Sequence, residues 1–221
     1  MLRYFNSLLL IFALTSLPVA LLAEQNPPEF SLEDLEQVED FDRGKFYSDP
    51  DTDWSVYTGI QLEAATVAFR RNWQRDQNKV DKFRVRDEDV ERIKHDMATL
   101  FDEVFTEELS SNGGYSMSSG AGDEVMRIEA HIVDLDVHAP YTRGTSFNVS
   151  YTERAGRMTL KLYVFDSISG DLIAAVDASR EAMSRPGAQV SNKVTNQAEA
   201  KRLLQNWARI LREKLDEHRK L

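Results

Sequence analysis

The stretch RMTLKLYVFDSISGDLIAAVDASRE, residues 157–181, decides the fold. Apolar and polar side chains alternate along Arg157–Asp166, which is the period of a β-strand; the apolar face is formed by Met158, Leu160, Leu162 and Val164. The segment 166–171 then predicts a tight turn, because Gly170 can adopt a positive φ angle. Leu172–Glu181 returns as a second strand, so the stretch is predicted to be an antiparallel hairpin.

The segment Glu124–His138 predicts another strand, and its apolar pattern changes phase partway along. One face carries Met126, Ile128, Ala130 and Ile132, and the other carries Val133, Leu135 and Val137. A phase change of one residue sends every later side chain to the opposite face unless a bulge absorbs it. We therefore predict a distortion at Ile132-Val133, or a strand that is covered on both faces over part of its length.

Two segments have the three- and four-residue apolar spacing of amphipathic helices. The first is Asp87–Ser110, with a stripe of Val90, Ile93, Met97, Leu100, Phe101, Val104, Phe105 and Leu109. The second begins at the capping residue Asn196, with a stripe of Leu203, Leu204, Trp207, Ile210, Leu211 and Leu215. Each stripe needs an apolar cover, and a sheet provides one.

The segment Trp54–Trp73 is ambiguous. Alternating residues favour a strand with a bulge near Ala65-Thr66, while its Glu and Ala content leaves a helix over Gln61–Arg71 as the rival interpretation. With the strand, the element order is β-α-β-β-β-α. We expect an α+β fold: an antiparallel sheet of about four strands with two amphipathic helices on one face. The other face, with Lys161, Tyr163 and Phe165, is then open, or covered by the preceding arm or a partner.

The chain divides into three parts. Residues 1–23 have the basic, apolar and small-residue order of a signal peptide, 24–53 form an acidic and partly ordered arm, and 54–221 form a single α+β domain. An uncleaved signal would become a membrane anchor. The chain has no cysteine, which excludes disulfides and lipid attachment through a cysteine, and fits the periplasm of a bacterium better than an animal secretory pathway.

Charge is uneven along the sequence. Glu24–Asp53 holds eleven acids against two bases, which argues against a nucleic-acid partner because phosphate binding needs a basic face. Arg70–Arg86 holds seven bases against two acids. That run is interpreted as a solvated connector, or alternatively as a dock for the acidic arm or for an anionic envelope partner.

Several short motifs resemble a family of bacterial envelope proteins, the domain of unknown function 3313. The residues that carry the resemblance are Ile132-Val133-Asp134-Leu135, Gly156 before Leu160–Val164, Asp166-Ser167-x-Ser169-Gly170-Asp171, Asp177-x-x-Arg180 and the Trp207 helix. The family has no assigned activity, so the resemblance supplies no catalytic residues, and we assign no cofactor. Many members are similar to lipoproteins, and this chain departs from them by lacking the cysteine.

Candidate chemistry is confined to one strand. Asp134, Asp136 and His138 occupy alternate positions, with His131 nearby, so they are weak candidates for a metal site. The competing interpretation is an exposed polar strand face. No Gly-x-Ser-x-Gly motif is present, and we assign no catalytic residue.

The sequence therefore predicts a non-enzymatic, exported binding or scaffold module for a protein or another envelope component. The alternative is a metal-dependent or small-ligand enzyme with a site on the His131–His138 strand. Self-association through an exposed strand edge is a third possibility.

Overall fold

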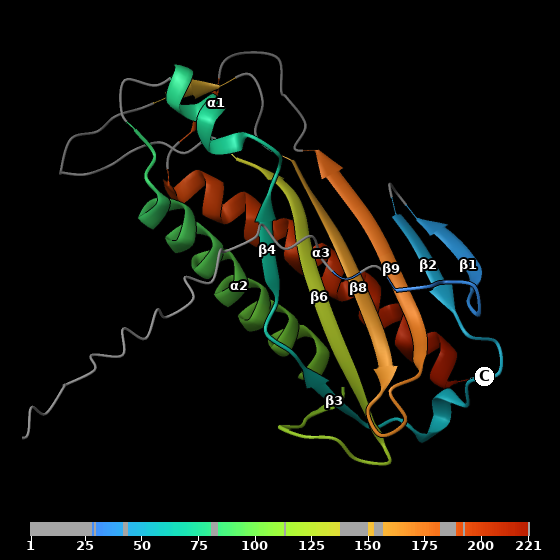
Figure 1. Ribbon diagram of the computed structural model, residues 1–221. Coiled ribbons are helices and arrows are strands. Elements are labelled where there is room, and N and C mark those ends of the chain that lie inside the picture. Colours follow the sequence, from blue (N-terminus) through green and yellow to red (C-terminus); the bar gives the residue numbers. More distant parts are fainter. Residues whose placement is uncertain are drawn as a thin grey trace, which may run out of the picture.

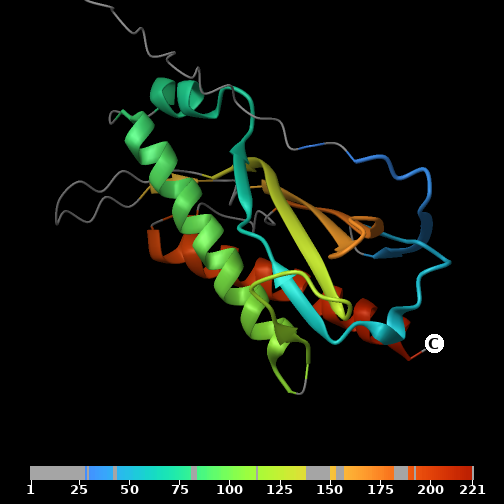
Figure 2. The ribbon, with the colours of Figure 1, turned by 60° about the horizontal axis from the view of Figure 1, so that its bottom comes forward.

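The computed structural model of this chain describes residues 28, 30–41, 44–80, 84–112, 114–137, 150–152, 157–181, 189–191 and 193–220. A large sheet forms the centre of the molecule, and two long helices lie together on one side of it (Figures 1 and 2). The predicted signal segment, residues 1–23, and His138 lie outside the described residues. Within the described part, no helix is long and apolar enough to cross a membrane.

The elements follow the chain from strands to helices and back. The helices are α1 (Trp73–Val80), α2 (Asp87–Ser110) and α3 (Lys193–Arg219), with a short 3-10 turn at Trp54–Val56. The strands are β1 (Glu36–Phe41), β2 (Gly44–Ser48), β3 (Gly59–Leu62), β4 (Thr66–Phe69), β5 (Ser116–Met117), β6 (Val125–Asp136), β7 (Ser150–Thr152), β8 (Arg157–Asp166), β9 (Leu172–Glu181) and β10 (Gln189–Ser191).

The main sheet corrects the predicted architecture. It has eight strands in the order β1-β2-β9-β8-β6-β3-β5, with β4 also paired to β6, while β7 and β10 form a separate pair. The predicted α+β class is confirmed, but an antiparallel sheet of about four strands with two helices is wrong. Strands β3 and β4 run parallel to β6. The reason is the connection: helices α1 and α2 carry the chain back between β4 and β6, and such a crossover joins parallel strands.

Three short elements were not predicted because their composition is polar. Strands β1 and β2 form within the acidic segment, and β2 pairs with β9 while burying Phe46 to 1% exposure. Helix α1 forms where a polar connector was predicted. It is held by Trp73, whose ring stacks on Phe69 at 3.9 Å and whose indole N–H donates to the Val137 carbonyl at 2.8 Å. Phe46 in β2 and Trp73 in α1 each bury an aromatic ring from an otherwise polar segment.

The strand interpretation of Trp54–Trp73 is confirmed, and the rival helix over Gln61–Arg71 is wrong. The chain forms β3 and then β4, and both pair with β6. Three residues, 63–65, separate the two strands, which is where the apolar phase changes in the sequence.

The distortion predicted at Ile132-Val133 is confirmed as a bulge in β6. Val133 pairs with Thr159 and Asp136 with Arg157, so two residues of β6 lie opposite one residue of β8. Asp134 takes a φ of 51°, a left-handed conformation that Asp tolerates better than most residues. The extra residue keeps Ile132 and Leu135 on the same, helix-covered face.

The predicted hairpin between β8 and β9 is also confirmed, and hydrogen bonds fix its turn. The Asp166 carboxylate accepts from the backbone N–H of Ser169 at 2.7 Å and of Ile168 at 3.0 Å. It also accepts from the Tyr57 hydroxyl at 2.9 Å, which ties the turn to the start of β3. Gly170 takes a φ of 78°. Burial alone would raise the pKa of Asp166, but these hydrogen bonds outweigh it and lower the pKa below its usual value.

The core lies between one sheet face and the stripes of α2 and α3. Its largest contributors include Phe101, Phe105, Trp207, Leu211, Ile128 and Leu160. The Arg212 guanidinium of α3 donates to the Glu108 carbonyl at 2.9 Å and to the Ser111 hydroxyl at 2.7 Å. These bonds satisfy groups at the C-terminal end of α2, so the two helices are joined by polar contacts as well as by packing.

Candidate functional site

The sheet has two faces of different character. Alternate residues of β6, β8, β9 and β2 point either toward α2 and α3 or to the opposite side, which we call the outer face. In β8, Leu160, Leu162 and Val164 belong to the helix-covered core. Lys161, Tyr163 and Phe165 consequently lie on the outer face.

The apolar part of the outer face is covered by the chain's own N-terminal segment. The Phe30 ring lies 4.6 Å from the Tyr163 ring and 5.1 Å from the Phe165 ring, and both contacts are edge-on. Leu32 and Leu35 pack against the same cluster. In Figure 1 this segment, drawn in blue, passes in front of the sheet while α3 runs behind it. Of the three possibilities for this face, coverage by the arm is therefore observed at its aromatic part.

The adjoining part of the outer face is polar. Strand register places one residue from each of five strands in a continuous line, which we call the polar row: Thr66 of β4, His131 of β6, Lys161 of β8, Asp177 of β9 and Lys45 of β2. Asp177 and Lys45 are exposed, and Lys161 is half-buried. Beside the row, the Thr159 hydroxyl donates to the Ser179 hydroxyl at 3.2 Å.

His131 is the unusual member of the polar row. Its side chain is buried, with 5% of the residue surface exposed. Its Nδ1 lies 2.8 Å from the Thr66 hydroxyl, but Nε2 has no hydrogen-bond partner among the described residues. Burial, and then the positive charge of Lys161, lower the pKa of His131, so the ring is neutral near pH 7. A buried polar atom without a partner is uncommon in a native fold and calls for an explanation.

The charged side chains around the polar row differ in whether they form ion pairs. Arg127 and Glu129 form an ion pair with each other, and the Arg127 guanidinium lies 4.3 Å from the centre of the Phe165 ring. Lys161 forms no ion pair within the part of the chain that the structure describes. The polar row thus combines, as far as the described residues extend, an ammonium group that forms no ion pair and an imidazole nitrogen without a hydrogen-bond partner.

The predicted metal candidates do not form one cluster in the described structure. The Asp136 carboxylate binds the Arg70 guanidinium at 2.7 Å, and Asp134 lies exposed in the bulge. His131 belongs to the polar row, and His138 lies outside the described residues. Among described residues, no three His, Cys, Asp or Glu side chains are close enough together to hold a metal ion.

Several bases of the run that follows β4 form ion pairs with nearby acids. Arg70 donates to Asp76 at 2.9 Å as well as binding Asp136, and Arg86 lies 3.4 Å from Glu88. The described part of the acidic arm is not its partner, because β1 lies at the far edge of the sheet from α1 (Figure 1).

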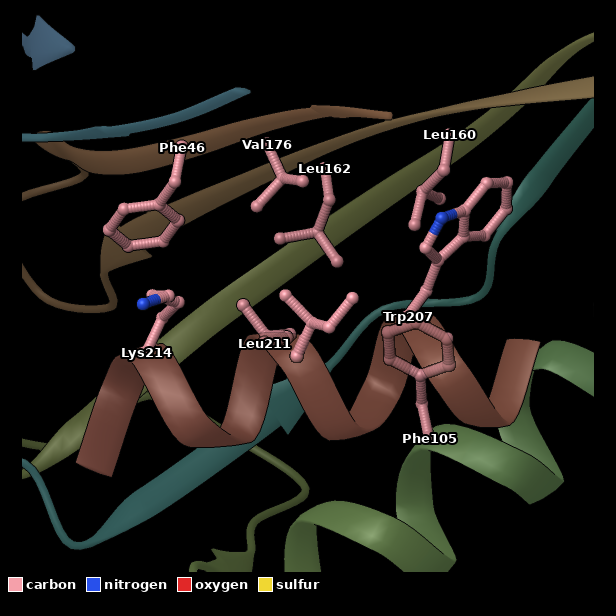
Figure 3. Close-up of a pocket in the computed structure, with 9 residues that line it drawn as sticks. Phe46, Phe105, Leu160, Leu162, Val176, Trp207, Leu211 and Lys214 are labelled. Atoms are coloured by element: carbon pink, nitrogen blue, oxygen red, sulfur yellow. The ribbon is translucent and has the colours of Figure 1, made fainter. Parts of the chain in front are cut away.

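A small crevice lies on the helix-covered side, between α3 and the sheet (Figure 3). Its walls are mostly apolar, with Leu162, Val176 and Trp207 among them, and Lys214 lies at its rim. Its free volume of about 10 Å³ is close to that of one water molecule, so it is a packing defect of the core rather than a ligand site.

Sequence reasoning identified His131 but not its neighbours. Thr66 and Lys161 come close to it only through strand register, and Thr66 does so through a parallel pairing that was not predicted. The available signal was the alternation around His131, between the core residues Ala130 and Ile132, which places it on the outer face.

The fold and site define a class: an α+β protein whose sheet is covered by helices on one face and offers a polar row on the other. The chain belongs to the family described as "Protein of unknown function (DUF3313)", whose profile matches residues 29–211. The resemblance found in the sequence is thus confirmed.

The fold is distantly similar to several solved structures. One is the PelC dodecamer from Paraburkholderia phytofirmans, with 7% identity, a TM-score of 0.37, and coverage of 75% of this chain and 96% of that chain. Another is a protein from Caulobacter crescentus CB15 assigned provisionally as a lipoprotein, with 14% identity, a TM-score of 0.32, and coverage of 54% and 80%. No curated protein matches the chain.

Proposed function

We propose that this protein is an exported, non-enzymatic binding module of the bacterial envelope. It would work in the periplasm and hold a protein or another envelope component on the polar part of its outer face. The N-terminal order of basic, apolar and small residues supports export.

One observation carries the proposal: His131 Nε2 is buried in the polar row with no partner among the described residues, directly beside Lys161, which forms no ion pair with any of them. The aromatic part of the same face already has its cover in Phe30, Leu32 and Leu35. The polar part is therefore where a partner would complete the sheet face. An enzymatic role for Asp134 and Asp136 is less well supported, because the Arg70 guanidinium already forms an ion pair with the Asp136 carboxylate.

Site-specific photocrosslinking in intact cells tests this function. A photoreactive amino acid replaces Asp177, which is exposed in the polar row, and in a matched strain it replaces Asp102, which is exposed on α2. We expect the first position to give a discrete adduct and the second to give none. The adduct mass identifies a second copy of the chain as one possible partner. Equal labelling at both positions, or none at either, would count against the proposal.

A further inference from the structure

We propose that the polar row binds an anionic oxygen group, a carboxylate or a phosphate, between His131 Nε2 and Lys161 Nζ. This inference rests on the proposed binding function and names the chemistry that the face would recognise. Register, hydrogen bonding and the distribution of charge each support it.

Register brings the two groups together. His131 and Lys161 are directly paired across β6 and β8 and share the outer face. Side chains in such pairs start from β-carbons about 5 Å apart, so a long lysine side chain can bring its ammonium group close to the imidazole. The influence of the Lys161 charge on the imidazole is consistent with this proximity.

The Thr66 hydroxyl allows His131 to act as a donor. A hydroxyl can donate its hydrogen to Nδ1, and the proton of a neutral imidazole then lies on Nε2. An Nε2–H group that is buried without an acceptor is costly, and an anionic oxygen is the acceptor that satisfies it best. The same hydroxyl can rotate, so ligand binding can select this tautomer.

The positive charge of Lys161 determines that the site favours an anion over a cation. A bare imidazole nitrogen could also bind a metal cation, but a neighbouring ammonium group repels one and attracts an anion. Asp177 lies opposite Lys161 on β9 and is the internal competitor, yet it forms no ion pair with Lys161 in the described structure. Because Nε2 itself is buried, a neighbouring side chain must turn aside on binding. Lys161 is suited to this, since its long side chain can move while its ammonium group stays within reach.

The test uses ring nitrogen resonances of ¹⁵N-histidine-labelled full-length protein. His131 is followed while inorganic phosphate or sodium acetate is added at constant ionic strength. We expect a saturable shift of His131 Nε2 with at least one of the two anions. Lys161→Gln should weaken that binding at least tenfold, because a charge-assisted hydrogen bond is lost.

Lys45→Gln is the matched control. It removes the same charge from the same row, but Asp177 separates it from Lys161, so we expect less than a twofold change. Saturation by acetate alone assigns the site to carboxylates, and saturation by phosphate alone assigns it to phosphate groups. Phosphatidylglycerol vesicles and a peptide with a free C-terminal carboxylate then distinguish the macromolecular sources.

Two results would overturn the inference: no saturable shift with either anion, or equal weakening in both lysine variants, which indicates general charge screening. Failure of the anion site alongside position-specific crosslinking at Asp177 rejects this inference and leaves the proposed function intact. Saturable anion binding without any crosslinked partner supports the anion site and counts against a macromolecular partner on this face.

Discussion

The two faces of the sheet are covered by different means. On one face, α2 and α3 lay long apolar stripes over β6, β8 and β9, and the contact is continuous. On the outer face, a few residues around Phe30 cover an aromatic cluster, and the polar row follows immediately. Stability is therefore concentrated on the helix-covered face, which leaves the outer face free to carry a buried histidine whose Nε2 has no partner among the described residues.

The largest loss of stability is expected for a substitution on the helix-covered face. Trp207→Ala removes a side chain that is 3% exposed between α3 and the sheet, and should lower the free energy of unfolding by about 3–5 kcal/mol. Urea denaturation measures the loss. Arg202→Ala, an exposed change on the same helix, should stay within about 0.5 kcal/mol. A loss below about 1 kcal/mol for Trp207→Ala would contradict the assignment of stability to this face.

A smaller loss is expected on the outer face. Phe30→Ala removes the ring that contacts Tyr163 and Phe165, and because Phe30 is only half-buried we expect about 1–3 kcal/mol. The same denaturation experiment applies. Val38→Ala, in the exposed strand β1, serves as control and should change little, since Val38 is 52% exposed. Equal effects of the two substitutions would show that the segment around Phe30 does not cover the sheet in solution.

The bulge in β6 keeps the core side chains before and after it on the helix-covered face. Substitution of Asp134 tests this feature. Asp134→Val forces a β-branched residue into a φ of 51° and should cost about 1–2 kcal/mol. Asp134→Gly should be tolerated within about 1 kcal/mol, because glycine adopts this conformation without steric cost. Thermal unfolding of the pair provides the measurement. If valine were tolerated as well as glycine, the left-handed conformation would be absent in solution.

The smallest effect concerns the pH dependence of stability. The pKa of folded His131 lies below its ordinary value of 6.5 because of burial and the Lys161 charge, so unfolding takes up a proton at mildly acidic pH. This contribution to stability is intact above about pH 6.5 and is lost as the pH falls through the folded-state pKa. His131→Gln should flatten that part of the curve of stability against pH, as measured by denaturation at a series of pH values.

Sequence patterns predicted the parts of the fold that carry a strong local period. The β8–β9 hairpin, helix α2 and the bulge in β6 all appear where alternation or helical spacing placed them. Strands β1 and β2 were missed because their own composition is polar, and because β2 joins the sheet by pairing with β9, which lies far along the chain. Helix α1 was missed for a similar reason, because it depends on Trp73 stacking on Phe69.

The candidate site was predictable only in part. Alternation places His131 and Lys161 on the outer face, but their pairing depends on register, and the contact with Thr66 depends on a parallel pairing across a helical crossover. Likewise, the Asp136–Arg70 ion pair that removes a metal candidate joins β6 to the residue after β4. The sequence shows which side chains could take part in a site. Which of them lie close together depends on the strand order and register, and these required the structure.

The position of β2 has a consequence for how the molecule folds. Gly44 pairs with Ala178, and Lys214 near the end of α3 forms an ion pair with Glu39 of β1. Contacts between such distant parts of a chain form slowly, because the entropy of closing a long loop is lost before the contacts compensate for it. A chain that emerges with its N-terminus first must hold the β1–β2 pair without its contacts to β9 and α3 until those elements have followed. We therefore expect this edge of the sheet to assemble late, and to be exposed to proteases and to pairing with other chains while the protein folds.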